Sequence, residues 1–410
     1  MLRRTKIIAT LGPATDDKSA IESLIRAGID LVRINFSHGT QADHQRRVYA
    51  VREYSAKLGR AVGILGDLQG PKIRIARFRN GRINLEPGQE FVLDAGPAEI
   101  EGSEKVVGVD YKQLPEDVDQ GDILLLDDGR IELLVDRVDN SRLICTVKTG
   151  GELSDNKGIN RKGGGLSAGA LTAKDRMDLK AAAAIQVDYI AVSFVRDASD
   201  LQTTRKILNE VKATAGIIAK IERSEAIQAV DEIIQASDGV MIARGDLGVE
   251  IGDAEVPAIQ KQIIERARSL DKPVITATQM MESMIQSPVP TRAEVSDVAN
   301  AVVEGTDAIM LSGETAVGRQ PEKVVTAAER VCLAAERQPC TRISRHRLDR
   351  RFKRVDEAIS MSAMYAANHL DIKAIVALTE SGSTPLWMSR IRTAIPIFGL
   401  SRHSDSLGKM

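Results

Sequence analysis

The chain has 410 residues, of which 43% are apolar and 28% are charged, so it can bury a large core in about two to three domains. Its 56 basic residues nearly balance its 57 acidic ones and aromatic residues make up only 3%, which excludes a surface built to bind nucleic acid. No apolar stretch reaches membrane-spanning length, the start lacks a signal-peptide pattern, and the 3 scattered cysteines suit a reducing compartment. We therefore expect a cytoplasmic protein with no nucleic-acid and no membrane partner.

Residues 5–68, and again about 166–338, alternate between short apolar segments and helix-like segments. Near-continuous apolar strands that alternate with amphipathic helices are typical of a parallel sheet covered by helices. The eight predicted strands are Lys6–Leu11, Leu31–Phe36, Val62–Leu68, Tyr189–Phe194, Ile217–Ile221, Val240–Ala243, Val274–Ala277 and Ala308–Leu311. The predicted helices include Asp17–Ala27, Ala42–Leu58, Ala198–Thr214, Glu225–Ala236, Pro257–Leu270 and Arg292–Glu304. This α/β pattern predicts a (β/α)8 TIM barrel, with a doubly wound open sheet as the alternative.

Residues 70 to about 165 interrupt this alternation with short strand-like segments between Gly, Pro, Asp and Asn. The predicted strands are Lys72–Phe78, Arg82–Leu85, Glu90–Leu93, Gly121–Leu126, Arg130–Val135 and Arg142–Val147. We expect a small inserted β-barrel, placed after the third strand and therefore above the rim where barrel active sites lie. A lid with a flexible return at Gly163-Gly164-Gly165 is our interpretation, and a purely structural insertion is the alternative.

After residue 340 a basic linker leads into a partial α/β segment. The linker contains Arg342, Arg345, Arg347, Arg350, Arg351, Lys353 and Arg354. The segment reads as helix Asp356–Leu370, strand Ala374–Leu378, a second helix and strand Ile395–Leu400, which is too little for an independent sheet. The predicted domains are thus residues 1–69 with 166–340 (barrel), 70–165 (lid) and 341–410 (partial C-terminal unit).

A lysine and two carboxylates stand where the fifth and sixth strands emerge from the core: Lys220, Glu222 and Asp246. Gathering one cation and two acids at such a place is costly, and a metal ion with an anionic substrate would offset the cost. Carboxylate oxygens suit Mg²⁺, and Lys220 would neutralise a phosphate and the charge that develops on its transfer. A purely structural ion-pair network with Arg244 is the alternative.

Polar groups follow most of the other predicted strands as well. Arg33 offers a planar fork for phosphate oxygens, and the backbone N–H groups of Gly245-Asp246 could hold a carboxylate. Thr278 could pass or orient a proton, or could simply bond to backbone. His38 could be a base or a nucleotide contact, and Arg74 could reach a phosphate when the lid closes or be an exposed strand residue. The remaining strand-end groups are Asn35, Ser37, Asp67, Ser193, Ser312 and Glu314.

Several of these segments are long and specific, and the chain resembles the pyruvate kinases over essentially its whole length. The segments are Thr5 to Pro13, Arg33 to Gly39, Gly66 to Arg74, Lys220-Ile221-Glu222, Ala243 to Glu250, Thr276 to Met284 and Met310 to Thr315. The resemblance implies phosphoryl transfer between phosphoenolpyruvate and ADP, giving pyruvate and ATP in the last step of glycolysis.

The resemblance also implies roles for single residues. Glu222 and Asp246 are expected to hold Mg²⁺ or Mn²⁺, and Lys220 to stabilise the phosphoryl group in transfer. The expected substrate contacts are Arg33, Lys220, Gly245, Asp246, Thr278, Ser312 and Glu314, with Lys220, Thr278 and Arg33 catalytic and Thr278 on the route that protonates the enolate. The expected nucleotide contacts are Asn35, His38, Arg74 and Lys174.

One departure from many relatives concerns K⁺. Those relatives bind K⁺ at positions matching Asn35, Ser37, Asp67 and the carbonyl of Leu68, with a Glu where this chain has Lys72. A tethered ammonium can supply the charge that a monovalent cation otherwise provides. We therefore expect Lys72 to replace K⁺ and the enzyme to work without it.

The second departure lies at the C-terminal end. Thr379 to Thr384 resembles part of a loop that binds sugar-phosphate or nucleotide effectors, whereas further elements of that domain are absent from this sequence. Effector control and assembly into the tetramer of the family are therefore left open. Two other functions remain as alternatives: a truncated, inactive homologue that acts as a binding partner, and a Mg²⁺-dependent keto-acid lyase.

Overall fold

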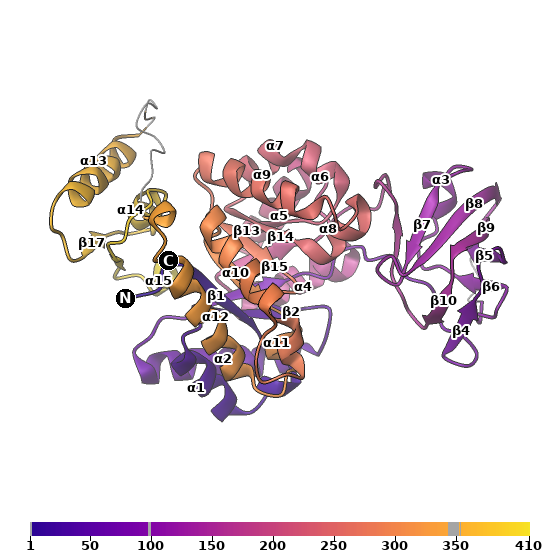
Figure 1. Ribbon diagram of the computed structural model, residues 1–410, viewed down its shortest axis with the longest axis horizontal. Helices are drawn as coiled ribbons and strands as arrows, with labels where there is room; N and C mark the ends of the chain where they lie inside the picture. The colour runs from indigo at the N-terminus through magenta and orange to yellow at the C-terminus, as the bar shows by residue number, and fades with distance from the viewer. Residues whose placement is uncertain (1, 97–99, 343–351, 353) are drawn as a thin grey trace.

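The fold is that of a computed structural model, and it is described for residues 2–96, 100–342, 352 and 354–410. Figure 1 shows a central barrel with its helices, a group of strands from the first half of the chain at one end, and the C-terminal elements at the other. The basic linker predicted after residue 340 lies mostly outside the described residues, because only Arg342 and Arg354 of its seven cations are within them.

Eight parallel strands close into a barrel, in the order β1-β16-β15-β14-β13-β12-β3-β2. They are β1 (Lys6–Thr10), β2 (Leu31–Asn35), β3 (Gly63–Asp67), β12 (Tyr189–Val192), β13 (Gly216–Ile221), β14 (Gly239–Ala243), β15 (Val274–Ala277) and β16 (Ala308–Leu311). Each coincides with a predicted strand to within two residues at either end. The predicted fold class, a (β/α)8 barrel rather than an open sheet, is confirmed.

Alternate residues of each strand face inward and outward, because side chains in a strand alternate between its two faces. Ile8, Leu65, Met241 and Met310 belong to a cluster buried inside the barrel. Their neighbours along the strands, such as Ile64, pack outward against the helices in a larger cluster. Burial of both faces explains why the strands read as continuous apolar runs.

The barrel helices run α1 (Lys18–Ala27), α2 (Gln41–Leu58), α4 (Ala173–Ala184), α5 (Ala198–Glu210), α6 (Ser224–Gln228), α7 (Val230–Ala236), α8 (Arg244–Ile251), α9 (Val256–Ser269), α10 (Arg292–Glu304), α11 (Gly313–Ala316) and α12 (Pro321–Ala335). Thr40, Thr172 and Thr291 start α2, α4 and α10 with reciprocal capping bonds to an acid three residues on. Such caps satisfy N–H groups that a helix start leaves unpaired.

Two predicted helices differ from the structure. The helix predicted to reach Thr214 ends at Glu210, because Lys212 turns into the left-handed region (φ 54°) and breaks the hydrogen-bond ladder. The helix predicted over Glu225–Ala236 is two helices, since Ala229 (φ −93°, ψ 13°) ends α6 and begins α7.

The inserted residues form a six-stranded sheet, ordered β11-β7-β8-β9-β5-β6, and a two-stranded sheet of β10 and β4. The elements are β4 (Arg82–Leu85), β5 (Glu90–Asp94), β6 (Val106–Gly108), α3 (Leu114–Asp117), β7 (Ile123–Leu126), β8 (Ile131–Asp139), β9 (Arg142–Thr149), β10 (Gly151–Ser154) and β11 (Ile159–Arg161). Their side chains bury a separate core around Phe91, Leu133 and Val135. This part of the chain lies apart from the barrel helices in Figure 1.

The strand predicted over Lys72–Phe78 is wrong as a continuous element. Arg74, Ile75 and Phe78 each form a single bridge, to three different parts of the insertion. Alternating apolar residues predicted a strand, but a ladder also needs one partner strand in register, which the segment lacks.

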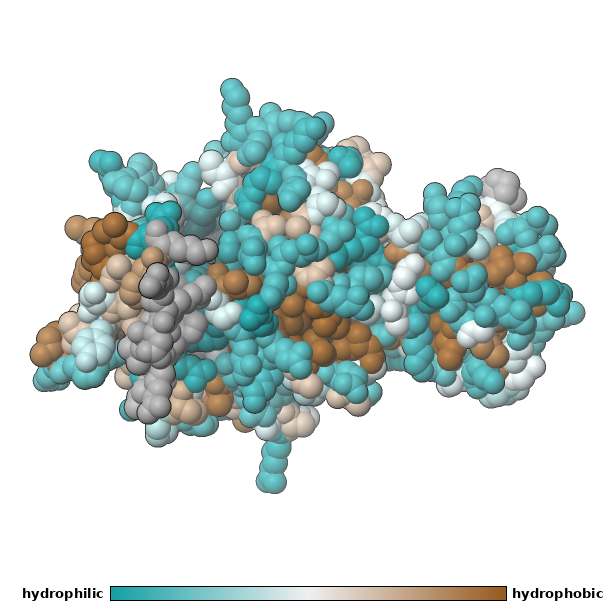
Figure 2. Space-filling model, turned by 90° about the horizontal axis from the view of Figure 1, so that it is seen from above, coloured by the Kyte–Doolittle hydropathy of each residue, from teal (hydrophilic) through white to brown (hydrophobic). Residues whose placement is uncertain are grey.

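The C-terminal elements are α13 (Val355–His369), β17 (Ile375–Leu378), α14 (Ser383–Ser389), β18 (Ile397–Leu400) and α15 (Ser404–Leu407). The strands β17 and β18 pair in parallel, and Val376 and Leu378 remain 60% and 79% exposed. The brown surface at the left of Figure 2 lies over this segment. An Arg390–Asp307 ion pair and a 2.8 Å bond from Tyr189 Oη to the Lys409 carbonyl join the segment to the barrel. Within the described ranges, no helix combines the length and apolar character needed to cross a membrane.

Candidate active site

Polar residues that the sequence placed after different strands meet at one edge of the barrel. Parallel strands of a closed barrel all end at the same rim, so residues far apart in the chain become neighbours there. Arg33 lies on β2, Asp67 ends β3, and Lys220 lies on β13. Hydrogen bonds and ion pairs join the side chains of all three, which makes this rim the candidate active site.

Asp67 is the buried acid that joins the two cations. Its Oδ2 accepts a 2.6 Å hydrogen bond from Arg33 Nε, and its Oδ1 lies 3.3 Å from Lys220 Nζ. Its side chain is 1% exposed. Burial alone would raise the pKa of Asp67, but the charges of Lys220 and Arg33 outweigh it and hold that pKa below its usual value. Asp67 is therefore an anion that fixes both cations.

Lys220 is buried and held at three points. Its ammonium lies 2.8 Å from Glu222 Oε1 and 3.3 Å from Asp67 Oδ1, and it donates a 2.7 Å hydrogen bond to Ser193 Oγ. Burial would lower the pKa of Lys220, yet Asp67 and Glu222 together raise it above its ordinary value. The side chain thus carries a permanent positive charge, as stabilising a phosphoryl group requires.

Glu222 and Asp246 supply carboxylates from neighbouring elements, the end of β13 and the first turn of α8. Glu222 is buried and also accepts a 2.7 Å bond from the N–H of Phe194. Burial raises the pKa of Glu222; Lys220 opposes this rise and the nearby charge of Asp246 adds to it. A divalent cation between the two acids would relieve that repulsion.

The donor set fits Mg²⁺, which protein sites often bind through one or two carboxylates completed by water and substrate phosphate oxygens. Across residues 2–96, 100–342, 352 and 354–410, no cluster of three or more His, Cys, Asp or Glu side chains is arranged to hold a metal. The two carboxylates would therefore need further oxygen ligands to complete an Mg²⁺ site.

Thr278 follows β15 and faces Gly245 at the start of α8. The Gly245 N–H donates a 2.8 Å hydrogen bond to Thr278 Oγ1, which itself donates to the Ala277 carbonyl. The backbone of Thr278 is left-handed (φ 69°), an unfavourable conformation for a β-branched residue and one that often marks functional sites. Arg244 braces this turn, since its guanidinium donates to the Thr278 carbonyl at 2.7 Å and pairs with Asp297 at 2.8 Å.

Glu314 and Ser312 follow β16 and close the rim next to Thr278. The Glu314 carboxylate is 2% exposed and accepts hydrogen bonds from the N–H groups of Met281, at 3.0 Å, and Ser312, at 2.6 Å. These bonds tie the turn that follows β15 to the turn that follows β16. In the structure, the Glu314 carboxylate is thus bonded to backbone N–H groups and is not exposed to solvent.

The four expected nucleotide contacts do not all meet. Lys174 Nζ donates to the Phe36 carbonyl at 2.7 Å, so α4 is tied to the loop that carries the exposed His38, and Asn35 Oδ1 accepts from the Ser37 N–H at 3.1 Å in the same loop. The Arg74 guanidinium donates instead to the Asn156 carbonyl, at 2.8 Å, within the insertion. The structure thus groups Asn35, His38 and Lys174 and leaves Arg74 with the inserted strands.

The residues expected at a K⁺ site contact different partners and do not form one site. Asp67 faces Arg33 and Lys220, and the Leu68 carbonyl accepts a 2.7 Å bond from Ser193 Oγ. Lys72 Nζ lies 3.0 Å from Asp246 Oδ1 and 3.9 Å from Asp128 Oδ1. Its ammonium therefore contacts a candidate metal ligand.

Two hydroxyl groups beside the cations had no role assigned from sequence. Ser193 accepts from Lys220, and Thr10 Oγ1 accepts a 3.3 Å hydrogen bond from the guanidinium of Arg33. Each hydroxyl lies at the end of a strand, and this position was the only feature of the sequence that pointed to a place in the site. A contact across the barrel depends on strand register, which a local pattern does not reveal.

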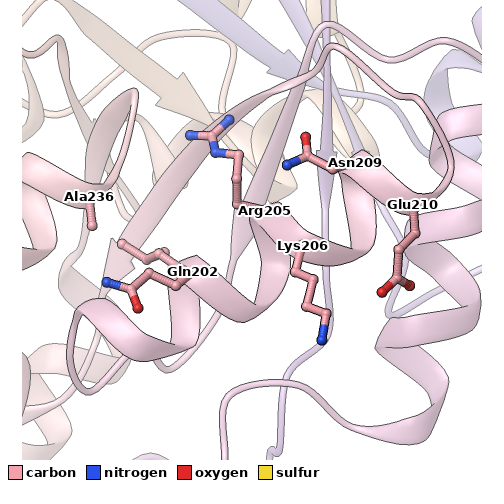
Figure 3. A pocket seen from close by; sticks show the side chains of 7 residues that line it. Gln202, Arg205, Lys206, Asn209, Glu210 and Ala236 are labelled. Carbon is pink, nitrogen blue, oxygen red and sulfur yellow. The ribbon is translucent and has the colours of Figure 1, made fainter.

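A surface groove along the outside of α5 is shown in Figure 3. It is lined by Leu201, Gln202, Arg205, Lys206, Asn209, Glu210 and Ala236. None of the converging charges of the rim borders it, so we place the active site at the strand ends and not in this groove.

Comparison with known proteins gives the family of the chain. A family model described as the pyruvate kinase barrel domain matches residues 2–325, and one described as the pyruvate kinase alpha/beta domain matches residues 357–410. The chain belongs to the pyruvate kinase family. It is 58% identical to pyruvate kinase II of Salmonella typhimurium, 55% to pyruvate kinase of Haemophilus influenzae and 44% to that of Mycobacterium tuberculosis. These alignments cover 98–99% of this chain and 84–86% of each relative.

The family and function predicted from the motifs are thereby confirmed, and neither the inactive homologue nor the keto-acid lyase is favoured. The matches to pyruvate kinases run through the barrel, the insertion between β3 and α4, and the C-terminal elements.

Proposed function

We propose that the protein is an ATP:pyruvate 2-O-phosphotransferase of glycolysis, which moves the phosphoryl group of phosphoenolpyruvate to ADP. A β-phosphate oxygen of ADP bonds to phosphorus, the bond from phosphorus to the enol oxygen breaks, and the enolate takes up a proton at carbon to give pyruvate. The observation that carries the proposal is the buried cluster of Arg33, Asp67 and Lys220 beside the carboxylates of Glu222 and Asp246.

In this proposal Arg33 and Lys220 bind the phosphoryl group. The guanidinium of Arg33 offers paired donors to phosphate oxygens, and the ammonium of Lys220 stabilises the charge spread over those oxygens in the transition state. Because Asp67 fixes both cations before substrate arrives, little reorganisation is needed when charge develops.

The carboxylate of phosphoenolpyruvate binds near Gly245 and Asp246, at the first turn of α8, where backbone N–H groups favour an anion. The hydroxyl of Thr278 lies 2.8 Å from the Gly245 nitrogen and so borders the same place. We assign Thr278 to the route by which the enolate carbon receives its proton, with Ser312 and Glu314 completing the substrate side of the rim.

Glu222 and Asp246 would hold one Mg²⁺ or Mn²⁺ ion. When bound, that ion supplies positive charge that stabilises the oxygens of the transferring group. Asn35, His38, Arg74 and Lys174 form the nucleotide side, and Arg74 reaches it when the insertion moves toward the barrel. Lys72 supplies the charge of a monovalent cation, so K⁺ is not required.

We propose three functional units: residues 1–69 with 166–340 as the catalytic barrel, 70–165 as its lid, and 341–410 as an effector and assembly unit. Phosphoenolpyruvate, ADP, ATP and pyruvate are the small-molecule partners. The proposed effector is a sugar phosphate or nucleotide bound at the loop around Ser381-Gly382-Ser383, and the proposed assembly is a homotetramer in the cytoplasm.

One assay tests the function. Purified protein with phosphoenolpyruvate, ADP and Mg²⁺ should release pyruvate and ATP in equal amounts. Lys220→Met should reduce the rate by at least about 1,000-fold, as expected for a charge that acts on the transition state. Lys206→Met, which removes an exposed lysine of α5, is the matched control and should keep the full rate. Pyruvate formed without ADP would instead indicate the lyase, and a silent wild-type protein the inactive homologue.

A further inference from the structure

The environment of the Lys220 ammonium contains a neutral group as well as two acids. Glu222 Oε1 lies at 2.8 Å, Asp67 Oδ1 at 3.3 Å and Ser193 Oγ at 2.7 Å. The contact with Ser193 is a hydrogen bond, whereas the contacts with the two carboxylates are ion pairs; because an ammonium can only donate, the Ser193 oxygen is the acceptor. The hydroxyl contact is the shortest of the three.

Ser193 is itself fixed in orientation. It is 1% exposed, and its Oγ lies 2.7 Å from the Leu68 carbonyl. A carbonyl can only accept, so the hydroxyl proton points to Leu68 and the oxygen lone pairs are left to face Lys220. The direction of the Lys220 bond is therefore set by the backbone of the residue that follows β3.

The residue after Ser193 reinforces this arrangement. Phe194 has a left-handed backbone (φ 55°), and its N–H donates a 2.7 Å hydrogen bond to Glu222 Oε2. The turn after β12 thus holds the ammonium through Ser193 and the carboxylate through Phe194. Strands β12 and β13 are hydrogen-bonded neighbours, so this turn forms a rigid support for the end of β13.

We propose that Ser193 is a positioning residue for Lys220: its anchored hydroxyl holds the ammonium out toward the phosphoryl site against the pull of two carboxylates. The inference rests on the proposed function, in which Lys220 stabilises the transferring phosphoryl group. Without the hydroxyl, attraction to Asp67 and Glu222 draws the ammonium deeper into the ion-pair cluster. A displacement of less than about 1 Å at such a group is enough to slow the chemical step strongly.

The test is steady-state kinetics of Ser193→Ala on the full-length protein with phosphoenolpyruvate, ADP and Mg²⁺. We expect kcat to fall about tenfold to 100-fold while KM for phosphoenolpyruvate changes less than about threefold, because the lost interaction acts mainly in the transition state. Ser193→Cys keeps the size of the side chain and a weak acceptor, so its kcat should lie between those of Ser193→Ala and wild type.

Ser237→Ala is the matched control. Ser237 is also 1% exposed and its hydroxyl also donates to a carbonyl, that of Ile234 at 3.1 Å, but it precedes β14 at the opposite end of the barrel strands. Its kcat should stay within about twofold of wild type. A Ser193→Ala enzyme with wild-type kcat, or one whose loss is matched by Ser237→Ala at equal loss of melting temperature, would overturn the inference. A wild-type protein that lacks activity would refute the proposed function instead.

Discussion

Arg33 on β2 and Asp67 at the end of β3 form a 2.6 Å hydrogen bond inside the rim of the barrel, and the same carboxylate reaches Lys220 on β13. One buried acid therefore sets the position of two cations that come from opposite sides of it. In the proposed function, the negative charge of Asp67 holds the two mutually repelling cations close together, so that both can face a phosphate.

Replacing Asp67 by Asn tests this relationship. The amide keeps the size of the side chain but removes the charge, which leaves two buried cations uncompensated. We expect kcat to fall at least about 100-fold and the free energy of unfolding to fall by about 3 kcal/mol. Kinetics and urea denaturation measure the two effects. Asp94→Asn, which removes the charge of a buried acid that pairs with the exposed Arg142 inside the inserted sheet, should lower stability and leave kcat unchanged.

The hydroxyl of Thr278 is the subject of a second prediction. Thr278→Val keeps the shape of the side chain but leaves the Gly245 N–H without its 2.8 Å acceptor, and we expect kcat to fall about 100-fold. Thr278→Ser retains the hydroxyl and should lose less than about fivefold. Thr276→Val removes a buried hydroxyl that lies on β15, two residues before Thr278, and bonds to Thr306; this variant should leave kcat unaltered. Equal losses in the Val and Ser variants of Thr278 would contradict the proposed role of the hydroxyl.

The strand ends could be predicted from sequence because eight apolar runs separated by amphipathic helices have few alternatives to a closed parallel barrel. Once the barrel is assumed, Arg33, Asp67, Lys220 and Glu222 must share a rim. What each side chain contacts could not be predicted. Ser193 meets Lys220, and Lys72 meets Asp246, through packing of segments 27 and 174 residues apart. Such pairings depend on register and on rotamers, which no local pattern encodes.

The insertion shows the same limit. Its long strands, such as β8 and β9, carried enough alternation to be predicted. The short strands β6, β10 and β11 were not predicted, whereas β4 and β7, which have four residues each, were. Short strands are defined by their partners rather than by their own pattern.

Metal binding gives a third prediction. Glu222→Gln removes one of the two carboxylates that would hold the divalent ion, and we expect at least about tenfold weaker Mn²⁺ binding in calorimetric titration. Glu225→Gln alters a partly exposed acid three residues away and should bind Mn²⁺ as wild type does. Unchanged affinity in Glu222→Gln would place the ion elsewhere.

Lys72 provides the fourth prediction. The wild-type rate should be independent of K⁺ in a Na⁺-free buffer, because the tethered ammonium supplies the charge. Lys72→Met should lose at least about tenfold in rate and recover part of it with K⁺. Lys157→Met removes another ammonium of the insertion, one that pairs with Asp127, and should show neither effect. A steep K⁺ requirement of the wild-type enzyme would refute the idea.

Glu250 at the end of α8 makes stability depend on pH. Its side chain is buried, Oε2 accepts a 2.8 Å bond from the Ser224 N–H, and its own carbonyl accepts from Gly163 where the insertion returns to the barrel. Burial raises the pKa of Glu250 from 4.5 to about 7; Ser224 and Arg223 oppose the rise and Glu225 adds to it. The folded state therefore binds this proton more tightly than the unfolded chain does.

This difference in pKa between the folded and unfolded states stabilises the fold. The full stabilisation is present below pH 4.5, and it is lost as pH rises through about 7. Glu250→Gln cannot ionise, so the variant should gain about 2–3 kcal/mol over wild type between pH 4.5 and pH 8 in urea denaturation. Glu265→Gln changes an exposed acid and is the control. Its free energy of unfolding should differ from that of wild type by the same amount at every pH in this range. Because the backbone carbonyl of Glu250 accepts from the Gly163 N–H, where the insertion rejoins the barrel, protection of residues 163–165 from hydrogen exchange, corrected for the intrinsic rise of exchange with pH, should fall above pH 7 in wild type and not in Glu250→Gln. A difference between variant and wild type that stays flat with pH would mean that the buried carboxyl remains ionised throughout.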